Sequence, residues 1–305
     1  PLEEFSSPYL TDFFTDECLD FIQQRGSADD HPPWFLFASY NAPHTPMQAT
    51  DDDLARFASI ADPKRRTYAA MLFALDRGVG RIRECLQETG QWDNTLCVFL
   101  SDNGGATNNG SWNGFLRGVK GCLREGGIRV PMIWTWPARF GGGQVCDAAV
   151  SALDILPTFL AACDAEPLPL EPPLSHQDKR NRNQMVATYG AYDGINLLPQ
   201  LRMPDRRVAR RLFWRLQGQA AVLDGDEKLV RLSHRPAEVF RVSDDAGESD
   251  DLSLKETEHT SRLLQELGRW EFLLPTMPAW GSSPYWNGQS ANHYDNWLVR
   301  PEPGR

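Results

Sequence analysis

The sequence predicts an α/β protein that ends in a smaller antiparallel sheet. Two apolar runs, at residues 34–40 and 95–101, flank a segment of helical periodicity, and a helix between two buried strands is typical of layered α/β folds. From residue 212 onward, short strand-like segments follow one another closely, as in an antiparallel meander. We therefore predict a larger α/β domain at residues 1–200 and a small β subdomain at residues 201–305.

The first elements are predicted to be a short helix and a strand. Thr15 suits an N-cap, and Asp16 and Glu17 follow it in the first turn, so we expect the helix to begin there. The continuous apolar run at residues 34–40 predicts a buried strand that leads into the stiff sequence "NAPHTP".

The best helix of the sequence is predicted between the two apolar runs, and Gly90 ends it. Its apolar residues are three or four positions apart, which gives one apolar face. They are Tyr68, Met71, Leu72, Leu75, Val79, Ile82 and Leu86.

Two more elements complete the predicted α/β part. A third apolar strand is expected at residues 129–137, with a proline near each end, and a helix at residues 151–163 with Pro157 in its first turns. The following polar stretch at residues 164–184 is rich in proline and charge, and we expect it to form a surface excursion.

The C-terminal subdomain is predicted to be four short strands and a helix. Turn signals such as Asp224-Gly225 separate the strand-like segments. These segments lie at residues 212–216, 219–225, 228–233 and 237–243. A helix at residues 256–272 is expected to cover one face of the sheet, and the aromatic tail at residues 278–297 is expected to pack on the body.

Composition excludes several classes of partner. The formal net charge of −10 makes nucleic acid or an anionic membrane surface an unsuitable partner, since both need concentrated Lys and Arg. No apolar run reaches the length of a membrane span, and the first ten residues lack the pattern of a signal peptide. The six cysteines are scattered without a C-x-x-C pair, so we expect buried thiols rather than disulfides or a zinc site.

Asp102 and Asn103 end the strand at residues 95–101. Ligands gather where strands of an open α/β sheet end, and a carboxylate beside a carboxamide supplies hard oxygen ligands for Ca²⁺ or Mg²⁺. The alternative is an Asx turn, in which both side chains satisfy only the loop backbone. This pair of residues does not by itself decide between the two interpretations.

Two other loops carry candidate residues. His44 lies between Pro43 and Pro46 on a stiff loop. A lone histidine is usually structural, but one held in this way is a better candidate for acid/base work or anion binding. Lys120 lies between Gly118 and Gly121, where its ammonium can neutralise an oxyanion, and the alternative is a solvated loop lysine.

Successive blocks of the chain resemble the type I sulfatases, which belong to the alkaline phosphatase superfamily. The blocks occur in the same order over nearly the whole chain, which makes the resemblance specific. They are "SYNAPHTP", "FLSDNGG", "GVKGCLREGGIRVP", "LDILPTFL", "DGINLLPQL", "GQAAVLDGDEKLVR" and "EVFRVSDDAGESDDL". The resemblance implies an alkaline-phosphatase-like mixed sheet flanked by helices, of which the N-terminal strands are missing here.

The resemblance also implies roles for the candidate residues. Asp102 and Asn103 match ligands of a Ca²⁺ ion that polarises the sulfate group. His44 matches the residue that contacts the sulfate and helps to protonate the leaving oxygen, and Lys120 matches the one that binds a sulfate oxygen. This chemistry suits displacement at sulfur, because a divalent cation and a lysine offset the charge of the oxyanions.

The other half of the family's site is absent from the sequence. The family uses an Asp-Asp pair and a C/S-x-P/A-x-R motif, whose Cys or Ser becomes the formylglycine nucleophile, and no segment of this chain matches that motif. The acidic run at residues 51–53 follows the His44 loop instead of preceding it, so we assign it to a helix N-terminus. The predicted Ca²⁺ site is therefore incomplete in this chain.

The sequence thus predicts a sulfuric ester hydrolase of the arylsulfatase type, acting on small aryl or carbohydrate sulfates in the complete protein. The fragment itself is expected to be inactive, with a missing N-terminal segment as its partner. The alternatives are a phosphomonoester or phosphodiester hydrolase of the same superfamily, and a non-catalytic relic that binds sulfated glycans. A periplasmic or secreted location is expected from the resemblance.

Overall fold

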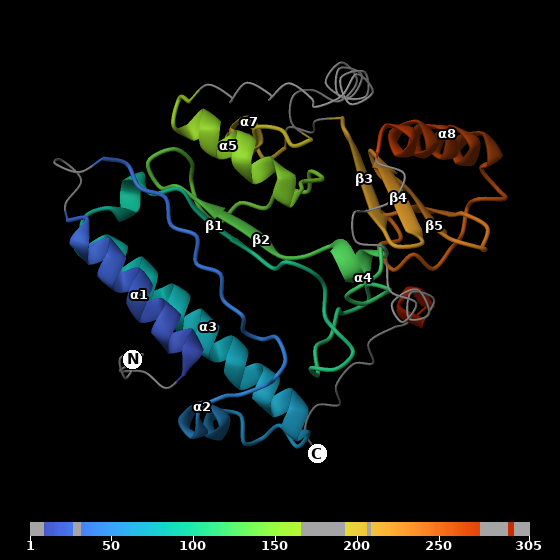
Figure 1. Cartoon of the computed structure of the whole chain (residues 1–305). Coiled ribbons are helices and arrows are strands. Elements are labelled where there is room, and N and C mark those ends of the chain that lie inside the picture. The colour runs from blue at the N-terminus through green and yellow to red at the C-terminus, as the bar shows by residue number, and fades with distance from the viewer. Residues whose placement is uncertain (1–8, 27–31, 166–192, 206–208, 275–291, 296–305) are drawn as a thin grey trace. The chain divides into compact units, whose positions relative to one another are not determined.

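The structure of the chain is a computed structural model, which describes residues 9–26, 32–165, 193–205, 209–274 and 292–295 (Figure 1). The chain forms two compact units. The first contains Pro1–Gly114, Val130–Arg139 and Leu298–Arg305, and the second contains Phe115–Arg129 and Phe140–Trp297. The domain limit expected between residues 200 and 201 stays a prediction.

The first unit is built on a pair of long helices and a two-stranded ladder (Figure 1). Its elements are α1 (Leu10–Gln24), α2 (Asp51–Arg56), α3 (Pro63–Glu88), η1 (Trp92–Asn94), β1 (Cys97–Leu100) and β2 (Met132–Thr135). Helices α1 and α3 pack along each other. Near their ends, Ile22, Cys85 and Leu86 form a buried cluster, and Trp34 and Cys97 pack against it.

Helix α1 begins earlier than the sequence predicted. Its N-cap is Tyr9. Thr15 lies inside the helix, fully buried, and its hydroxyl donates a hydrogen bond of 2.9 Å to the Thr11 carbonyl. A threonine that satisfies its hydroxyl on the preceding turn is tolerated in a helix interior, which is why its N-cap preference was misleading.

The main helix and the acidic helix start agree with the predictions. Helix α3 begins with Pro63 after an Asp62 N-cap, and it ends at Glu88, just before Gly90. Thr50 caps α2, whose first turn is the acidic run at residues 51–53. The buried Asp53 of that run forms an ion pair with Arg77, so its role is structural.

Strands β1 and β2 confirm two of the three strands predicted in the α/β part. They pair antiparallel, with Cys97 opposite Thr135 and Leu100 opposite Met132. The prediction of a strand at residues 34–40 is wrong, because this segment forms no ladder with any described strand. Its apolar composition indicated a sheet interior, but a strand exists only where a neighbour supplies backbone partners.

The second unit contains a four-stranded antiparallel sheet and several helices. Its elements are α4 (Glu125–Ile128), η2 (Ala152–Asp154), α5 (Ile155–Ala162), α7 (Leu198–Arg202), β3 (Arg211–Leu216), β4 (Gln219–Asp224), β5 (Glu227–Leu232), β6 (Glu238–Arg241) and α8 (Thr257–Leu273). The strand order β3-β4-β5-β6 confirms the predicted meander, and Gly225 turns β4 into β5 with φ +67°. Pro157 is the third residue of α5, as expected.

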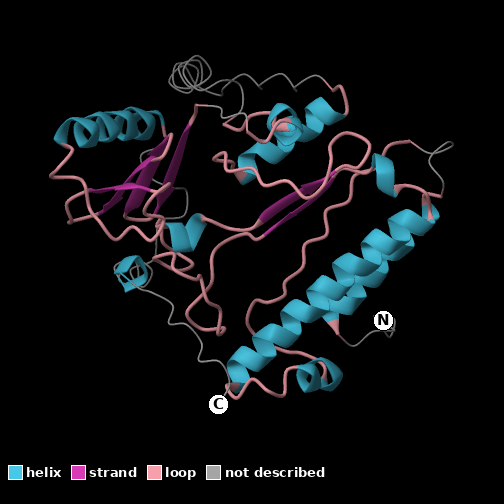
Figure 2. Ribbon diagram, turned by 180° about the vertical axis from the view of Figure 1, so that it is seen from behind, coloured by secondary structure: helices cyan, strands magenta, loops and turns pink. Residues whose placement is uncertain are grey.

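Both faces of the meander are covered. Helix α8 lies over one face of the sheet (Figure 2). On this face, Leu263 and Leu267 pack against Val222 and Leu229. On the other face, Leu123 and Tyr294 pack against Ala221, Val230 and Leu232. Because successive strand residues point to opposite faces, one face of the sheet packs against α8 and the other packs against the segment around Leu123.

The remaining expectations have mixed outcomes. Of the aromatic tail, the structure describes residues 292–295, and Tyr294 is buried on the meander as predicted. Most of the polar excursion at residues 164–184 lies outside the described residues. All six cysteines are free. Three are buried as expected (Cys18, Cys85 and Cys122), but Cys97 and Cys146 are half-buried and Cys163 is exposed. Among the described helices, none combines the length and the apolar character that crossing a bilayer requires.

Candidate functional site

His44 lies on a loop that is fixed to α1. The Tyr40 hydroxyl and the Thr15 hydroxyl are 2.9 Å apart, which joins the start of the loop to the helix. Both X-Pro bonds of the loop, Ala42–Pro43 and Thr45–Pro46, are cis. The His44 backbone N–H then closes the turn on the Asn41 carbonyl at 2.8 Å.

The imidazole of His44 is exposed and has one nitrogen committed. Its Nδ1 lies 2.6 Å from the Thr45 carbonyl oxygen. Because a carbonyl only accepts, Nδ1 carries a proton in this contact, and the neutral ring keeps its lone pair on Nε2. Nε2 is therefore the atom that can accept a proton from, or donate one to, a bound molecule.

Asp102 and Asn103 follow the end of β1. The Ser101 N–H donates to the Pro131 carbonyl, which continues the pairing of β1 with the residue before β2. The Ser101 hydroxyl donates to the Asn103 carbonyl at 2.9 Å. Asn103 Nδ2 donates to the Gly104 carbonyl at 3.0 Å. Its Oδ1 and the exposed Asp102 carboxylate accept no hydrogen bond from any described residue.

The loop after Asn103 is held by its own polar side chains. Asn113 accepts from the Gly105 N–H at 2.7 Å, and the Ser111 hydroxyl donates to the Ala106 carbonyl at 2.8 Å. The buried Asn109 donates to the Pro43 carbonyl at 3.4 Å. This last contact joins the loop that follows the Asp102-Asn103 pair to the His44 loop.

Lys120 lies in the second unit, on the loop before α4. Gly118 and Gly121 flank it with φ +92° and +91°, a backbone conformation that glycine adopts without strain. The half-buried Lys120 side chain forms no ion pair or hydrogen bond within the described part of the chain. Three candidates thus belong to the first unit, and Lys120 belongs to the second.

The donor atoms at Asp102 and Asn103 fit a hard cation. Both free acceptors are oxygens, a carboxylate and an amide, which are the ligand types that Ca²⁺ and Mg²⁺ prefer. Calcium takes six to eight oxygens in proteins, so the pair supplies only part of a ligand set. Asp102 and Asn103 would hold such an ion, with further ligands from elsewhere.

A second acidic cluster in the structure was not predicted. Glu227, Glu256 and His259 place three ligand atoms within 4.8 Å of one another. However, Arg262 and Arg241 already form ion pairs with these two carboxylates. The negative charge of the two carboxylates is therefore neutralised by arginines of the same chain. The cluster is a surface network of ion pairs beside the meander rather than a metal centre.

Sequence reasoning also missed the side chains under the Lys120 loop. Glu125 and Lys228 are buried and form an ion pair of 2.7 Å, and Glu248 lies 3.1 Å from the same ammonium. The lysine belongs to the predicted strand "KLVRLS", where a charge at an inward position was a signal that could have been followed.

Comparison with known proteins identifies related sequences. The model of a family described as Sulfatase matches residues 3–165, more than half of the 305 residues, and this range contains all four candidate residues. N-acetylgalactosamine-6-sulfatase of Homo sapiens is 33% identical over 210 residues, which is 67% of this chain and 34% of that protein. The uncharacterized sulfatase YdeN of Escherichia coli (strain K12) is 34% identical over 158 residues, 51% of this chain and 28% of that protein. The chain thus spans roughly a third of the length of these relatives.

Solved structures with a similar fold agree. Ps i-CgsB in complex with k-i-k-neocarrahexaose has a TM-score of 0.76 and 32% sequence identity, and the match covers 92% of this chain and 58% of that one. Phosphonate monoester hydrolase of Agrobacterium radiobacter matches with a TM-score of 0.57 at 18% identity, covering 87% of this chain and 60% of that one, which shows a shared fold alone. The predicted alkaline-phosphatase-like α/β fold is confirmed.

Proposed function

Because this chain belongs to the sulfatase family, we propose that the complete protein hydrolyses sulfate esters, with His44, Asp102, Asn103 and Lys120 in its active site. The substrate class we propose is a sulfated carbohydrate, with small aryl sulfates as surrogates. Support comes from the name of the human relative, N-acetylgalactosamine-6-sulfatase, and from the neocarrahexaose bound to Ps i-CgsB.

The observation that carries the proposal is the hydrogen bond that fixes one ring nitrogen of His44 and leaves the other available. The Nδ1 of His44 is committed to the Thr45 carbonyl, so Nε2 is the ring nitrogen left to exchange a proton with a bound molecule, on a loop that two prolines and the Tyr40 contact stiffen. When the ring is doubly protonated, Nε2 carries the proton that can be donated. Cleavage of the S–O bond leaves negative charge on the departing oxygen. Nε2 of His44 would donate a proton to that oxygen, which is the work of a general acid.

The other three residues would bind the sulfate group. The Lys120 ammonium has no internal partner in the described residues, so it would place its charge beside a sulfate oxygen. Asp102 and Asn103 would hold a Ca²⁺ ion, whose positive charge would polarise the sulfate when bound. The identity of the ion is part of the proposal: the hard oxygen donors suit both Ca²⁺ and Mg²⁺, and the choice of Ca²⁺ follows from the family resemblance.

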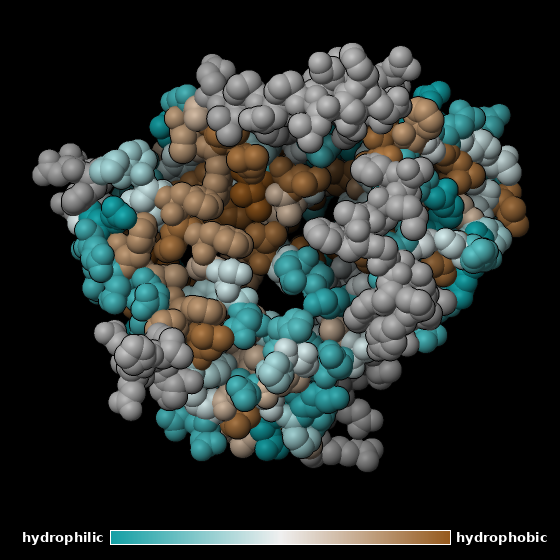
Figure 3. Space-filling view, in the orientation of Figure 1, coloured by the Kyte–Doolittle hydropathy of each residue, from teal (hydrophilic) through white to brown (hydrophobic). Residues whose placement is uncertain are grey.

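The nucleophile is proposed to come from a further segment of the protein. This chain lacks the C/S-x-P/A-x-R motif. Within the first unit, Phe35, Phe37, Phe99 and Ile133 are 68, 76, 38 and 57% exposed, and Figure 3 shows apolar side chains gathered over β1 and β2. Such a patch is typical of a surface that another segment covers. We propose that the segment with the nucleophile packs there, and that the protein acts in the periplasm or outside the cell.

The test begins with the DNA upstream of the Pro1 codon. An in-frame C/S-x-P/A-x-R motif is expected there, and the complete polypeptide should hydrolyse an aryl sulfate. Lys120→Ala should lower kcat/KM by roughly 100-fold or more, because it removes a charge that offsets the oxyanion. Lys255→Ala is the matched control, since Lys255 pairs with the exposed Asp250 on the surface.

Two results would overturn the proposal. A preference for the matched aryl phosphate would indicate the phosphoester hydrolase alternative. A genuine start codon at this point, together with binding of sulfated glycans but no hydrolysis, would indicate the non-catalytic relic.

A further inference from the structure

The side chain of Gln219, at the start of β4, contacts the Lys120 loop through both ends of its amide. Its Nε2 donates to the Gly121 carbonyl at 2.9 Å, and its Oε1 accepts from the Leu123 N–H at 3.0 Å. The residue is 1% exposed, so water does not compete for these bonds. The bonded backbone groups begin at the residue directly after Lys120.

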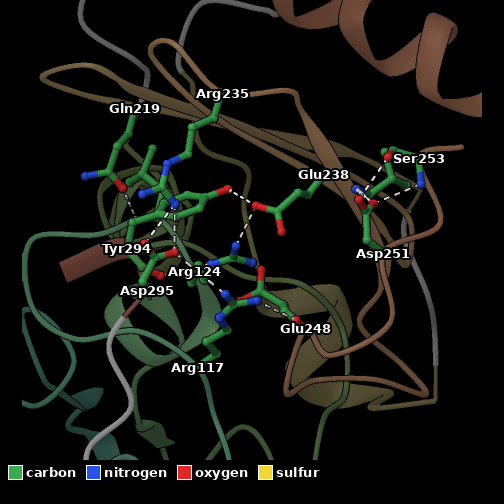
Figure 4. Close-up of polar contacts among 12 residues, drawn as sticks. Arg117, Arg124, Gln219, Arg235, Glu238, Glu248, Asp251, Ser253, Tyr294 and Asp295 are labelled. Atoms are coloured by element: carbon green, nitrogen blue, oxygen red, sulfur yellow. Dashed lines mark hydrogen bonds and ion pairs between the residues drawn. The ribbon is translucent and has the colours of Figure 1, made fainter. Parts of the chain in front are cut away.

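The next residues of the loop are bound to the same sheet. The Glu125 N–H donates to Glu248 Oε2 at 2.8 Å, and the Glu125 carboxylate pairs with Lys228 of β5 at 2.7 Å. Arg124, fully buried, donates to Glu238 of β6 at 2.6 Å (Figure 4). The meander and the segment after it therefore fix the loop on one side at successive residues.

The loop is also closed on itself around Lys120. The Gly126 N–H donates to the Arg117 carbonyl at 2.6 Å, and the Val119 N–H donates to the Cys122 sulfur at 3.3 Å. A Cβ on Gly126 would lie 2.3 Å from the Gly118 carbonyl oxygen, so the two ends of the loop are in contact. The backbone around Lys120 is thus fixed, while its ammonium has no partner among the described residues.

We propose that Gln219 is a positioning residue, whose two hydrogen bonds to Gly121 and Leu123 set the place of the Lys120 ammonium in the sulfate site. The small C-terminal sheet thereby contributes to the reaction without touching the substrate. The inference rests on the proposed function, because it takes Lys120 to contact the sulfate. A shift of about 1 Å in such a group is enough to cost on the order of 100-fold in rate.

The test is a double-mutant cycle in the complete protein. Gln219→Met keeps the volume of the side chain and removes both hydrogen bonds, and it should lower kcat/KM for an aryl sulfate by roughly 10- to 100-fold. In the Lys120→Ala background the same change should have almost no further effect, since it acts through Lys120. Ser233→Ala is the control, because the Ser233 hydroxyl bonds the Gly218 carbonyl at the same end of the sheet but contacts no residue of the loop.

A second variant separates positioning from loss of fold. The carboxyl group of Gln219→Glu can replace both amide bonds only when it is protonated, because only then does it donate to Gly121. Its kcat/KM relative to the unsubstituted protein should therefore recover as the pH is lowered, and that of Gln219→Met should not. Amide exchange at Leu123, followed by mass spectrometry on the 305-residue chain, should be faster in Gln219→Met and unchanged in Ser233→Ala.

The possible results are distinguishable. Equal effects of Gln219→Met with and without Lys120→Ala would overturn the positioning role, as would a Gln219→Glu variant without acid recovery. A Lys120→Ala variant of full activity would instead overturn the role of Lys120 in the proposed function. Unchanged exchange at Leu123 in Gln219→Met would show that the two hydrogen bonds do not hold the loop, and would also overturn the inference.

Discussion

Replacing Lys228 by Met should destabilise the second unit strongly, because it removes the buried cation that Glu125 and Glu248 share. Glu125 keeps a longer ion pair with Arg129 at 3.5 Å, whereas Glu248 loses its pair of 3.1 Å. The Lys228 side chain has no exposed area, and neither has that of Glu248, while Glu125 retains 9%. Methionine is close to lysine in length and apolar volume, so little cavity is formed and the electrostatic effect dominates. Removing one partner of a buried ion pair costs about 3–5 kcal/mol of unfolding free energy, and we expect that range here.

The loss should depend on pH in a defined direction. Burial lowers the pKa of Lys228, but Glu248 and Glu125 outweigh it and raise the pKa overall, so the lysine is charged at neutral pH. Burial raises the pKa of Glu248, and without Lys228 it would rise further. A raised pKa in the folded state gives stability at low pH that is lost as the pH rises through it. The Lys228→Met deficit should therefore be smaller at pH 5 than at pH 8.

Urea unfolding monitored by tryptophan fluorescence measures this effect. Trp270 of α8 stacks on Phe213 of β3 with centroids 5.2 Å apart, so its emission reports on the packing of the meander. Lys255→Met is the control, because its pair with Asp250 has both side chains more than 60% exposed and should contribute less than about 1 kcal/mol. If Lys228→Met cost no more than Lys255→Met, or if its deficit grew on acidification, the reasoning about the buried charges would be refuted.

Three further predictions concern the metal, the acid and a thiol. Isothermal titration of Ca²⁺ into the chain should give a Kd of about 1 mM or weaker. Asp102→Ala should abolish this binding, whereas Asp52→Ala, at the exposed start of α2, should not. Tight binding would mean that more ligands are present than inferred. In the complete protein, His44→Gln should lower kcat for a sugar sulfate by about 100-fold or more. The loss should be much smaller for a nitrophenyl sulfate, because its leaving group needs little protonation, and His234→Asn is the control. Equal losses for the two substrates would contradict the role of His44 as the acid. Burial raises the pKa of Cys97 to about 11 from a usual value near 9, so this thiol should lower the unfolding free energy by about 2 kcal/mol between pH 9 and pH 11. A Cys97→Ala variant with the same pH slope would contradict this assignment.

Local sequence patterns predicted most of the elements, but their starting points depended on packing. The apolar spacing of α3 and the alternating strands of the meander are local properties, so both were found. Thr15 was predicted as the N-cap, yet the N-cap of α1 is Tyr9, six residues earlier. The Thr15 hydroxyl bonds the Thr11 carbonyl inside the helix, and α1 packs on α3. The run at residues 34–40 has the composition of a strand but forms no ladder in the described residues.

The candidate site residues were singled out by local sequence signals, and their role in the chemistry is a proposal. His44, Asp102, Asn103 and Lys120 stand out because each lies beside a proline, a strand end or a pair of glycines, and these are local signals. They also lie in the ordered blocks that resemble the sulfatases, and the family match bears out that resemblance.

The support of these side chains depends on tertiary contacts. The structure showed that His44 commits Nδ1 to Thr45, and that Gln219, 98 residues beyond Gly121, holds the loop that carries Lys120. No local pattern contains such a pairing, because the hydrogen-bond partner of a buried amide is set by which strands fold beside which loop. The candidate residues can therefore be recognised from local sequence, whereas their positions result from contacts between distant parts of the chain.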